Sequence, residues 1–439
     1  MKARKILYVL PYEFYFNGLN NTVGGHTSHI IGVIEAFRQK GFRIEIISDM
    51  PVPGLNAQAV TYSVPAFQSI RRMFRTLRIS KNNRNPDAAT GSFGYGKYWL
   101  RISALFLLNH INRLIFYLGL FTATLRCSIR SSTYLIYYRH NLNGFIPALV
   151  SKMTGIPSVV EVNTPISLSA HYYSKKICTD KLKPRVTWRE MLQYEFSEVI
   201  SVVSPIIQKW ISENCRNCVS KKILVNPNGV NPDSFRPKNR AGYVRKRSNI
   251  AGNEILIGMA AVFVNYNAIE ELVEAFRLAK GKFPRLRLLL MGESELRNSL
   301  EAHVSSQNLN ESITFTGSVP FVRMGEYYSD CDILVSHFNF GNRPAHNCSI
   351  KHLEYMAAGK PVVATDIGHV NYAIKHNQNG LLVPHGDIQG FSEAILKLAT
   401  DSELRFKFGN QARRDVESFH TWQDNINRIL HRVSREPID

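Results

Sequence analysis

The chain has 439 residues, too many for one ordinary hydrophobic core, so its length predicts two domains. Its 44% hydrophobic and 20% charged residues are typical of a globular protein and exclude a disordered chain or a polytopic membrane protein. The formal net charge of +20 at pH 7 indicates a phosphate-bearing ligand, an anionic membrane surface or nucleic acid as partner, unless the basic surface is merely solvated.

Neither a leader nor a membrane span is predicted. The basic start of the chain leads into an apolar run that ends at Pro11, shorter than the roughly 7–15 residues of a signal-peptide core. No run approaches the roughly 18 apolar residues of a spanning helix, so the protein is expected in the cytoplasm. The six cysteines are scattered and expected to be reduced, and Cys215 and Cys218 lack the second pair that a zinc site requires.

The first half of the chain alternates apolar strands with helices. The first strand is followed by a glycine loop at Thr22–His26 and a helix at His29–Arg38, in which apolar residues recur at helical spacing. The apolar runs interpreted as strands lie at 6–9, 44–47, 134–137, 158–162, 199–203 and 223–225. This alternation predicts a parallel sheet covered by helices on both faces.

The alternation restarts after a basic stretch at 236–253 that contains Pro and Gly and is interpreted as a linker. The later strands are expected at 255–258, 286–291, 313–315, 333–335, 362–364 and 381–383. The predicted organisation is therefore an N-terminal domain at 1–237, a linker at 238–253, a C-terminal domain at 254–418 and a final helix at 419–439. Ligands of open parallel sheets bind at the carboxyl ends of the strands, which places the site in a cleft between the two domains.

Residues 66–133 interrupt the alternation of strands and helices in the first domain. They hold eleven Lys or Arg and one acid, Asp87, and positions 70, 73, 74 and 77 are apolar at helical spacing. The opposite helical face carries Arg71, Arg72, Arg75 and Arg78. Basic amphipathic helices of this kind lie on anionic bilayers. An ordinary pair of packed helices joined by a basic loop would give the same pattern.

The most informative stretch for chemistry is 347–365, which is interpreted as a loop, a helix at about Ser349–Ala358 and a buried strand. Free backbone N–H groups at the start of that helix, near Ser349, Ile350 and Lys351, would form a seat for a diphosphate. The side chain of Lys351 adds a positive charge. Glu354, one turn later, could accept hydrogen bonds from two neighbouring hydroxyls, as on a ribose.

This stretch resembles the donor-site signature of glycosyltransferase family 4 and similar GT-B enzymes, in which two Glu residues precede a Met-Ala-x-Gly-x-Pro-Val-Val run. The resemblance covers nearly the whole chain. Other segments that carry it are Gly24–His26, Gly144–Asn163, Asn226–Val230, Leu272–Phe276, Gly317–Pro320, Cys331–Leu334, Asn379–Pro384 and the final helix from Trp422.

The resemblance implies a retaining glycosyltransferase built from two Rossmann-like domains, with a nucleotide-diphosphate sugar as donor and neither metal nor cofactor. Glu354 would hold the ribose, and the amides of Ser349–Lys351 would hold the diphosphate. The loop at Gly24 and Gly25 would help from the other domain. The backbone of Gly317, Ser318 and Val319 would read the base. Stabilising the charge of the leaving diphosphate would be the main catalytic task.

Three positions depart from the family pattern. The first Glu of the signature falls on His346, and the diphosphate-clamping Arg and Lys fall on Val262 and Asn267. The Glu usual after the Pro-Val-Val strand falls near Asn371–Tyr372. Arg343, Lys351 and Arg323 are candidates to replace the lost cations. The departures leave two hypotheses open: an active glycosyltransferase, or a degenerate GT-B protein that binds or regulates without turnover.

Other polar residues are weaker candidates for the site. His26, after the glycine loop, could touch donor or acceptor, or could cap a helix. On the acceptor side, His140, Glu161 and Asn163 follow predicted strands, where acceptor contacts would be expected. The expected partners are a nucleotide sugar, a glycan or lipid-linked acceptor of a surface polysaccharide and an anionic membrane, with no specific nucleic acid, because no nucleic-acid-binding module is recognisable. The protein is expected to be peripheral on the inner membrane face.

Overall fold

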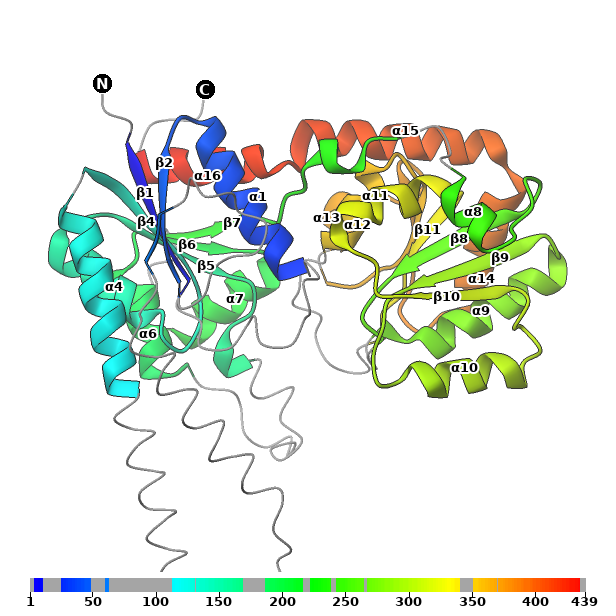
Figure 1. Cartoon of the computed structure of the whole chain (residues 1–439), viewed down its shortest axis with the longest axis horizontal. Helices are drawn as coiled ribbons and strands as arrows, with labels where there is room; N and C mark the ends of the chain where they lie inside the picture. Colours follow the sequence, from blue (N-terminus) through cyan, green and yellow to red (C-terminus); the bar gives the residue numbers. More distant parts are fainter. Residues whose placement is uncertain are drawn as a thin grey trace, which may run out of the picture. The chain divides into compact units, whose positions relative to one another are not determined.

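The computed structural model describes residues 4–10, 25–48, 60–62, 113–130, 132–168, 186–215, 222–237, 242–263, 267–339, 350–368 and 370–434 (Figure 1). The chain forms two compact units. One unit comprises residues 1–18, 38–167 and 183–200, and the other comprises residues 19–37, 168–182 and 201–439. The basic amphipathic helix predicted at 70–78 lies outside the described residues.

The first half of the chain forms a seven-stranded sheet in the order β3-β2-β1-β4-β5-β6-β7. Its strands are β1 (Lys5–Leu10), β2 (Arg43–Ser48), β3 (Val60–Tyr62), β4 (Thr133–Arg139), β5 (Ser158–Val162), β6 (Val199–Val202) and β7 (Ile223–Val225). The pairings from β3 to β5 are parallel, as predicted. β1 and β5 are buried along their whole lengths, because helices cover both faces of such a sheet.

Local sequence signals explain the helices of this half. Among the described residues the helices are α1 (Gly25–Gln39), α4 (Phe145–Thr154), α6 (Trp188–Phe196) and α7 (Pro205–Asn214), and residues 113–129 are also helical. Gly155, in the left-handed conformation (φ 69°), ends α4. Thr187 and Glu190 form a capping box at the start of α6, and Ser204 caps α7.

The second half contains a six-stranded sheet in the order β10-β9-β8-β11-β12-β13, in which the central β8 is flanked by β9 and β11. The strands are β8 (Ile255–Ala260), β9 (Leu286–Met291), β10 (Ile313–Gly317), β11 (Ile333–Ser336), β12 (Val362–Thr365) and β13 (Gly380–Val383). This order reverses direction between β8 and β11, and ligands of doubly wound sheets bind at that point.

Helices cover both faces of the second sheet, and two apolar clusters fill the layers between. One cluster packs α9 (Ile269–Lys282), α10 (Arg297–Ser306) and α14 (Ile388–Thr400) on the sheet. The other packs α11 (Phe321–Asp330), α12 (Ile350–Ala357) and α13 (Val370–Ala373). Both sheets are thus doubly wound α/β layers, which confirms the predicted fold class (Figure 1).

The stretch predicted as a linker contains a short helix, α8 (Tyr243–Arg247). The backbone N–H groups of Gly242 and Val244 donate to the carboxylate of Asp330, at 2.9 and 2.7 Å. The buried guanidinium of Arg245 pairs with Asp332. These contacts tie α8 to the second sheet, although its composition is basic and poor in apolar residues.

The C-terminal helices end the second half and return to the first. α15 (Ser402–Phe419) leads into α16 (Trp422–Ser434). The ring of Trp422 meets that of His29 on α1 edge to face at 4.5 Å, and it lies so close to Gly32 that a Cβ there would approach its Nε1 to 2.1 Å. Asn425 donates to the carbonyl of Pro227, just after β7, at 2.8 Å. These contacts confirm the predicted return of the final helix to the first half.

Two smaller expectations can also be compared with the structure. Cys127 and Cys331 are buried free thiols, but Cys215 is disulfide-bonded, which contradicts the expectation of a reduced thiol there. The expectation of reduced thiols rested on the scattered positions of the cysteines in the sequence, which do not show which thiols meet in the fold. In the part of the chain that the structure describes, no helix is both long and apolar enough to cross a membrane.

Candidate active site

The centre of the candidate site is α12, the helix predicted from the signature. Its last turn leads through Gly359 (φ 66°) into β12. The hydroxyl of Tyr355 fixes the helix to the end of β8, since it accepts a hydrogen bond from the N–H of Ala260 at 2.8 Å. This anchor places α12 at the carboxyl end of β8, at the reversal point of the sheet.

Glu354 lies on the buried side of α12, with 8% of its surface exposed. Its Oε2 accepts a hydrogen bond of 3.1 Å from the hydroxyl of Tyr328 on α11. Burial raises the pKa of Glu354 to about 7, although the hydrogen bond from Tyr328 and the charge of Lys351 act in the opposite direction. A carboxyl group with a pKa near neutrality can change its charge when a ligand enters.

Lys351, one turn before Glu354, reaches one of the positions where the family pattern loses a cation. Its Nζ donates to Oδ1 of Asn267 at 3.2 Å and lies 4.3 Å from the centre of the Phe338 ring. Asn267 in turn donates to the carbonyl of Val262 at 2.7 Å. Burial lowers the pKa of Lys351 to about 7, and Glu354 partly offsets this effect. The side chain of Lys351 thus brings a titratable ammonium group to Asn267.

The loops after β8, β9 and β10 meet at the same edge of the sheet. Gly292, directly after β9, leaves no room for a side chain, since a Cβ would lie 1.7 Å from the carbonyl oxygen of Ala261. Its N–H donates to the carbonyl of Gly317, which ends β10, at 3.1 Å. Ser318 follows as an exposed residue and Val319 as a half-buried one. The backbone predicted to read the base therefore lies at the carboxyl edge.

A polar network that was not predicted supports this edge. The buried imidazole of His337, after β11, lies 3.1 Å from Oε2 of Glu271 on α9 and 3.1 Å from Oγ1 of Thr365 at the end of β12. Glu271 also accepts a hydrogen bond from Asn339, whose Oδ1 lies 2.9 Å from Nε2 of His385. Burial lowers the pKa of His337. The network fixes the chain on either side of Phe338, on whose ring Lys351 lies.

On the first sheet, His140 is a buried residue at the end of β4. Its ring stacks on Tyr194 at 5.3 Å, and its Nε2 lies 3.1 Å from the Tyr194 hydroxyl. Burial lowers the pKa of His140 to about 4, although Glu190, 3.8 Å away, acts in the opposite direction. The carboxylate of Glu190 is itself held by Thr187 and Ser167. His140 is therefore a neutral group with buried partners at neutral pH.

The other acceptor-side candidates, Glu161 and Asn163, lie beside His140. The N–H of His140 donates to the carbonyl of Glu161 at 2.8 Å. The carboxylate of Glu161 accepts from the Tyr137 hydroxyl and from Nδ2 of Asn163, both at 2.5 Å, and lies 3.6 Å from Nε of Arg139. The three predicted residues thus come together at the carboxyl ends of β4 and β5. Their contact with an acceptor stays a prediction.

Several predicted site residues cannot be placed. Gly24, Arg343, His346 and Ser349 lie outside the described residues, while Gly25 and His26 are described only as the first backbone positions of α1. Ile350 is the first residue of α12. Arg323, a candidate replacement cation, instead pairs with Glu326 and lies over the ring of Tyr243. Among the described residues no group of His, Cys, Asp and Glu is arranged to hold a metal ion, and metal-free transfer stays a prediction.

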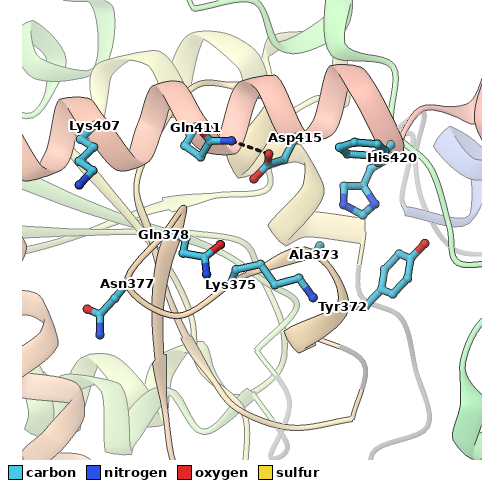
Figure 2. A pocket seen from close by; sticks show the side chains of 10 residues that line it. Tyr372, Ala373, Lys375, Asn377, Gln378, Lys407, Gln411, Asp415 and His420 are labelled. Atoms are coloured by element: carbon cyan, nitrogen blue, oxygen red, sulfur yellow. Dashed lines mark hydrogen bonds between the residues drawn. The ribbon is translucent and has the colours of Figure 1, made fainter.

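A separate pocket of about 590 Å³ lies between α15 and the segment that joins α13 to β13 (Figure 2). Tyr372, Lys375, Gln411, Asp415 and His420 are among its lining residues, and none of the predicted site residues is. Asp415 is held by Gln411 and Asn379 at 2.7 and 2.6 Å. Tyr372 lines this pocket near the position where the family pattern would place a Glu.

Comparison with known proteins agrees with this arrangement. Residues 243–415 match the family model of glycosyl transferases group 1. An uncharacterized glycosyltransferase from Methanocaldococcus jannaschii is 23% identical over 92% of both chains. The capsular polysaccharide biosynthesis glycosyltransferase CapM from Staphylococcus aureus is 25% identical over 51% of this chain and 57% of its own length. The match covers only 24% to 49% of three other curated relatives.

The fold agrees with solved structures as well. HepE from Anabaena, crystallised with UDP and glucose, superposes with a TM-score of 0.66 at 15% identity, covering 99% of this chain and all of HepE. At that identity the likeness shows the fold alone. The chain therefore has the GT-B fold of these structures, and its residues 243–415 match the family model of glycosyl transferases group 1.

Proposed function

We propose that the protein is a retaining glycosyltransferase that moves a sugar from a nucleotide-diphosphate sugar to a glycan or lipid-linked acceptor in the synthesis of a surface polysaccharide. The observation that carries the proposal is the placement of both Lys351 and Glu354 on α12, at the carboxyl end of β8. The role of CapM in capsular polysaccharide biosynthesis supports the polysaccharide, and the UDP and glucose bound to HepE support the donor class.

In this proposal Glu354 binds the ribose hydroxyls and Lys351 binds the diphosphate. A ribose supplies two neighbouring O–H donors, which an ionised carboxylate accepts. The ammonium group of Lys351 and the N–H groups at the start of α12 would stabilise the negative charge that develops on the leaving diphosphate. The side chains of this site supply that stabilisation themselves, so we propose that the transfer needs neither a metal ion nor a cofactor.

The first experiment is a thermal-shift screen with UDP-glucose, UDP-N-acetylglucosamine, GDP-mannose and dTDP-rhamnose. A nucleotide sugar at 100 times its Kd adds about 2.7 kcal/mol to the stability of the folded state. The ligand that binds is then titrated calorimetrically, and its hydrolysis is followed with and without an acceptor glycan. Failure of all four donors to bind would contradict the proposal.

Two variants test the roles of the pair. Glu354→Gln keeps the shape but loses the charge, and should weaken donor binding by roughly 1–3 kcal/mol. Lys351→Met should lower turnover more than binding, because its charge acts mainly on the departing diphosphate. Glu326→Gln, whose partner Arg323 lies on the same helix, is the control and should change neither.

A degenerate GT-B protein that binds or regulates without turnover is the second candidate. One observation favours it: Val262, 62% exposed, and Asn267 stand where similar enzymes carry cations. Tight donor binding without hydrolysis or transfer to any offered acceptor would favour this candidate.

We also propose that the protein is cytoplasmic and peripheral on the inner face of the membrane. The basic stretch at 66–133 supports this location, since it holds eleven Lys or Arg and one acid. The combination of net positive charge and apolar blocks along that stretch favours a bilayer over nucleic acid, whose binding would be non-specific and lost with salt.

A further inference from the structure

The pocket beside α15, which we call the α15 pocket, contains neither Lys351 nor Glu354. One of its walls is α15, and the other is α13 with the segment that leads from α13 to β13 (Figure 2). Its volume of about 590 Å³ lies within the range of about 300–1,000 Å³ that is usual for small-molecule sites. The α15 pocket is therefore large enough for a ligand of its own, apart from the donor site.

A buried imidazole lines this pocket. His420, directly after α15, is 7% exposed, and its backbone is fixed by hydrogen bonds to Val416 at 3.0 Å and from Val230 at 2.9 Å. Its ring meets that of Tyr372 edge to face at 5.3 Å, but no described residue forms a hydrogen bond with its ring nitrogens. Burial lowers the pKa of His420 to about 4, so the ring is neutral at pH 7. A neutral imidazole offers a ligand one donor and one acceptor.

The polar groups around this ring are amides and a carboxylate. Asn377 and Gln378 line one wall, and Gln411 and Asp415 line the other. The carboxylate of Asp415 accepts hydrogen bonds from Gln411 and Asn379, and a carboxylate has room for further donors. Amides both donate and accept. This set of groups suits a ligand whose own groups also do both, as hydroxyls do.

Two aromatic rings give the pocket an apolar face. Tyr372 is 37% exposed and Phe419 is 63% exposed, and both line the cavity. The C–H groups of a pyranose make one face of the sugar apolar, and this face can pack on aromatic rings while the hydroxyls reach polar groups. Inorganic phosphate would leave the rings unused and would meet the negative charge of Asp415. A wholly apolar ligand would bury the amides without partners. The lining therefore fits a saccharide best.

The charges of the lining residues favour an acidic sugar. Lys375 and Lys407 come from different walls and are accompanied by one acid, Asp415 (Figure 2). The Nζ of Lys375 donates to the carbonyl of Asn371 at 3.0 Å, and Lys407 forms no ion pair with a described residue. A carboxylate on the ligand would be attracted to the two ammonium groups. Because both lysines are exposed to solvent, this preference should be only roughly two- to fivefold.

We propose that the α15 pocket binds a saccharide unit, preferably one that carries a carboxylate. This inference rests on the proposed function in one respect: if the product is a polysaccharide, the pocket would hold part of the acceptor chain. A second contact with the chain, besides the one at the reacting end, raises its effective concentration at the enzyme and retains it between transfers.

The test measures binding of trigalacturonate, cellotriose and inorganic phosphate by calorimetry, with no nucleotide sugar present. Trigalacturonate should bind most tightly, cellotriose less tightly and phosphate not measurably. Phe419→Ser should weaken trigalacturonate binding about tenfold, because the sugar loses its aromatic contact. Phe406→Ser is the matched control, since Phe406 is 73% exposed on the same helix but does not line the pocket. Binding of neither saccharide, equal losses in the two variants, or phosphate that binds as tightly as trigalacturonate would overturn the proposal.

A local readout distinguishes this pocket from other places where a glycan could bind. In protein with nitrogen-15-labelled histidine, trigalacturonate should shift the ring resonances of His420, which His420→Gln identifies by their loss. UDP-glucose should leave them unchanged. Saccharide binding that does not move these resonances would place the ligand elsewhere and overturn the proposal. UDP-glucose titration of the same sample reports on the donor site alone, so failure of the proposed function and failure of the α15 pocket give different results.

Discussion

The Lys351–Glu354 pair predicts that donor binding passes through a maximum near neutral pH. Burial brings the pKa of Glu354 up to about 7 and the pKa of Lys351 down to about 7. The carboxylate accepts ribose hydroxyls best above its pKa, and the ammonium group attracts a diphosphate below its pKa. The association constant for UDP-glucose should therefore rise between about pH 5.5 and 7 and fall between about pH 7 and 8.5.

The change in the association constant on each side of pH 7 follows from the hydrogen bonds involved. A hydrogen bond to a charged group contributes about 1.5–3 kcal/mol, which corresponds to roughly 10- to 150-fold in the association constant. Glu354→Gln should lose the rise of the association constant up to pH 7 and keep the fall above it. Lys351→Met should keep the rise and lose the fall. UDP-glucose is the ligand of choice because its diphosphate is a diester and has no proton to lose in this range.

Glu354→Gln should also change stability with a predictable sign. The folded-state pKa of Glu354 lies above its ordinary value of 4.5, so the wild type loses stability as pH rises from 4.5 to about 7. The pKa shift from 4.5 to about 7 corresponds to a loss of at most about 3 kcal/mol in the free energy of unfolding. Glu354→Gln would not show this loss. Calorimetric titrations at half-unit pH steps and constant ionic strength, with melting curves at each pH, test both effects. A wild type without a maximum, or variants that keep both the rise and the fall, would refute the assigned roles.

Three further predictions concern stability. Burial lowers the pKa of His140 from 6.5 to about 4, so this residue binds a proton more readily in the unfolded chain and acidification destabilises the fold. Between pH 7 and 5 the free energy of unfolding of His140→Gln, measured in urea, should therefore fall by about 2 kcal/mol less than that of the wild type. Arg245→Ala leaves the buried carboxylate of Asp332 without its ion-pair partner and should lower the free energy of unfolding by about 3–5 kcal/mol. Arg247→Ala, on the same short helix, should change it by no more than about 0.5 kcal/mol, as measured by thermal unfolding. Gly292→Ala should lower both the melting temperature and UDP-glucose affinity, because its Cβ would collide with a carbonyl, and Gly252→Ala, with open space around it, should change neither.

The sequence was a good guide to the strands, because buried parallel strands appear as continuous apolar runs. β5, β7 and β9 have the predicted bounds, and most other described strands differ by one or two residues at an end. β3 was missed, since a strand of three residues leaves almost no periodic signal. α8 was missed for a different reason: Arg245 and two aspartates hold it beside the buried Val244, and so short and basic a segment shows no apolar periodicity.

The candidate site was predictable only where one continuous segment builds it. α12 and its residues Lys351 and Glu354 could be found because loop, helix and strand follow each other in the sequence. The network of His337, Glu271 and Asn339 could not, because its members come from separate elements and carry no shared spacing. His140 was expected at a strand end and is there, but its stacking on Tyr194 depends on the tertiary structure, which no local pattern encodes.

The loss of a cation at position 267 acquires a physical explanation from the position of Lys351. The Nζ of Lys351 already lies 3.2 Å from the side chain of Asn267, so a second ammonium group there would face it at short range. Two like charges in a partly buried site repel strongly, and each would also bear the cost of leaving water. A neutral amide avoids both costs and accepts a hydrogen bond from the ammonium group of Lys351. Among the described residues, Lys351 and the N–H groups at the start of α12 would then neutralise a donor diphosphate at this edge. A substitution at Lys351 should therefore remove charge stabilisation that similar enzymes divide between two residues.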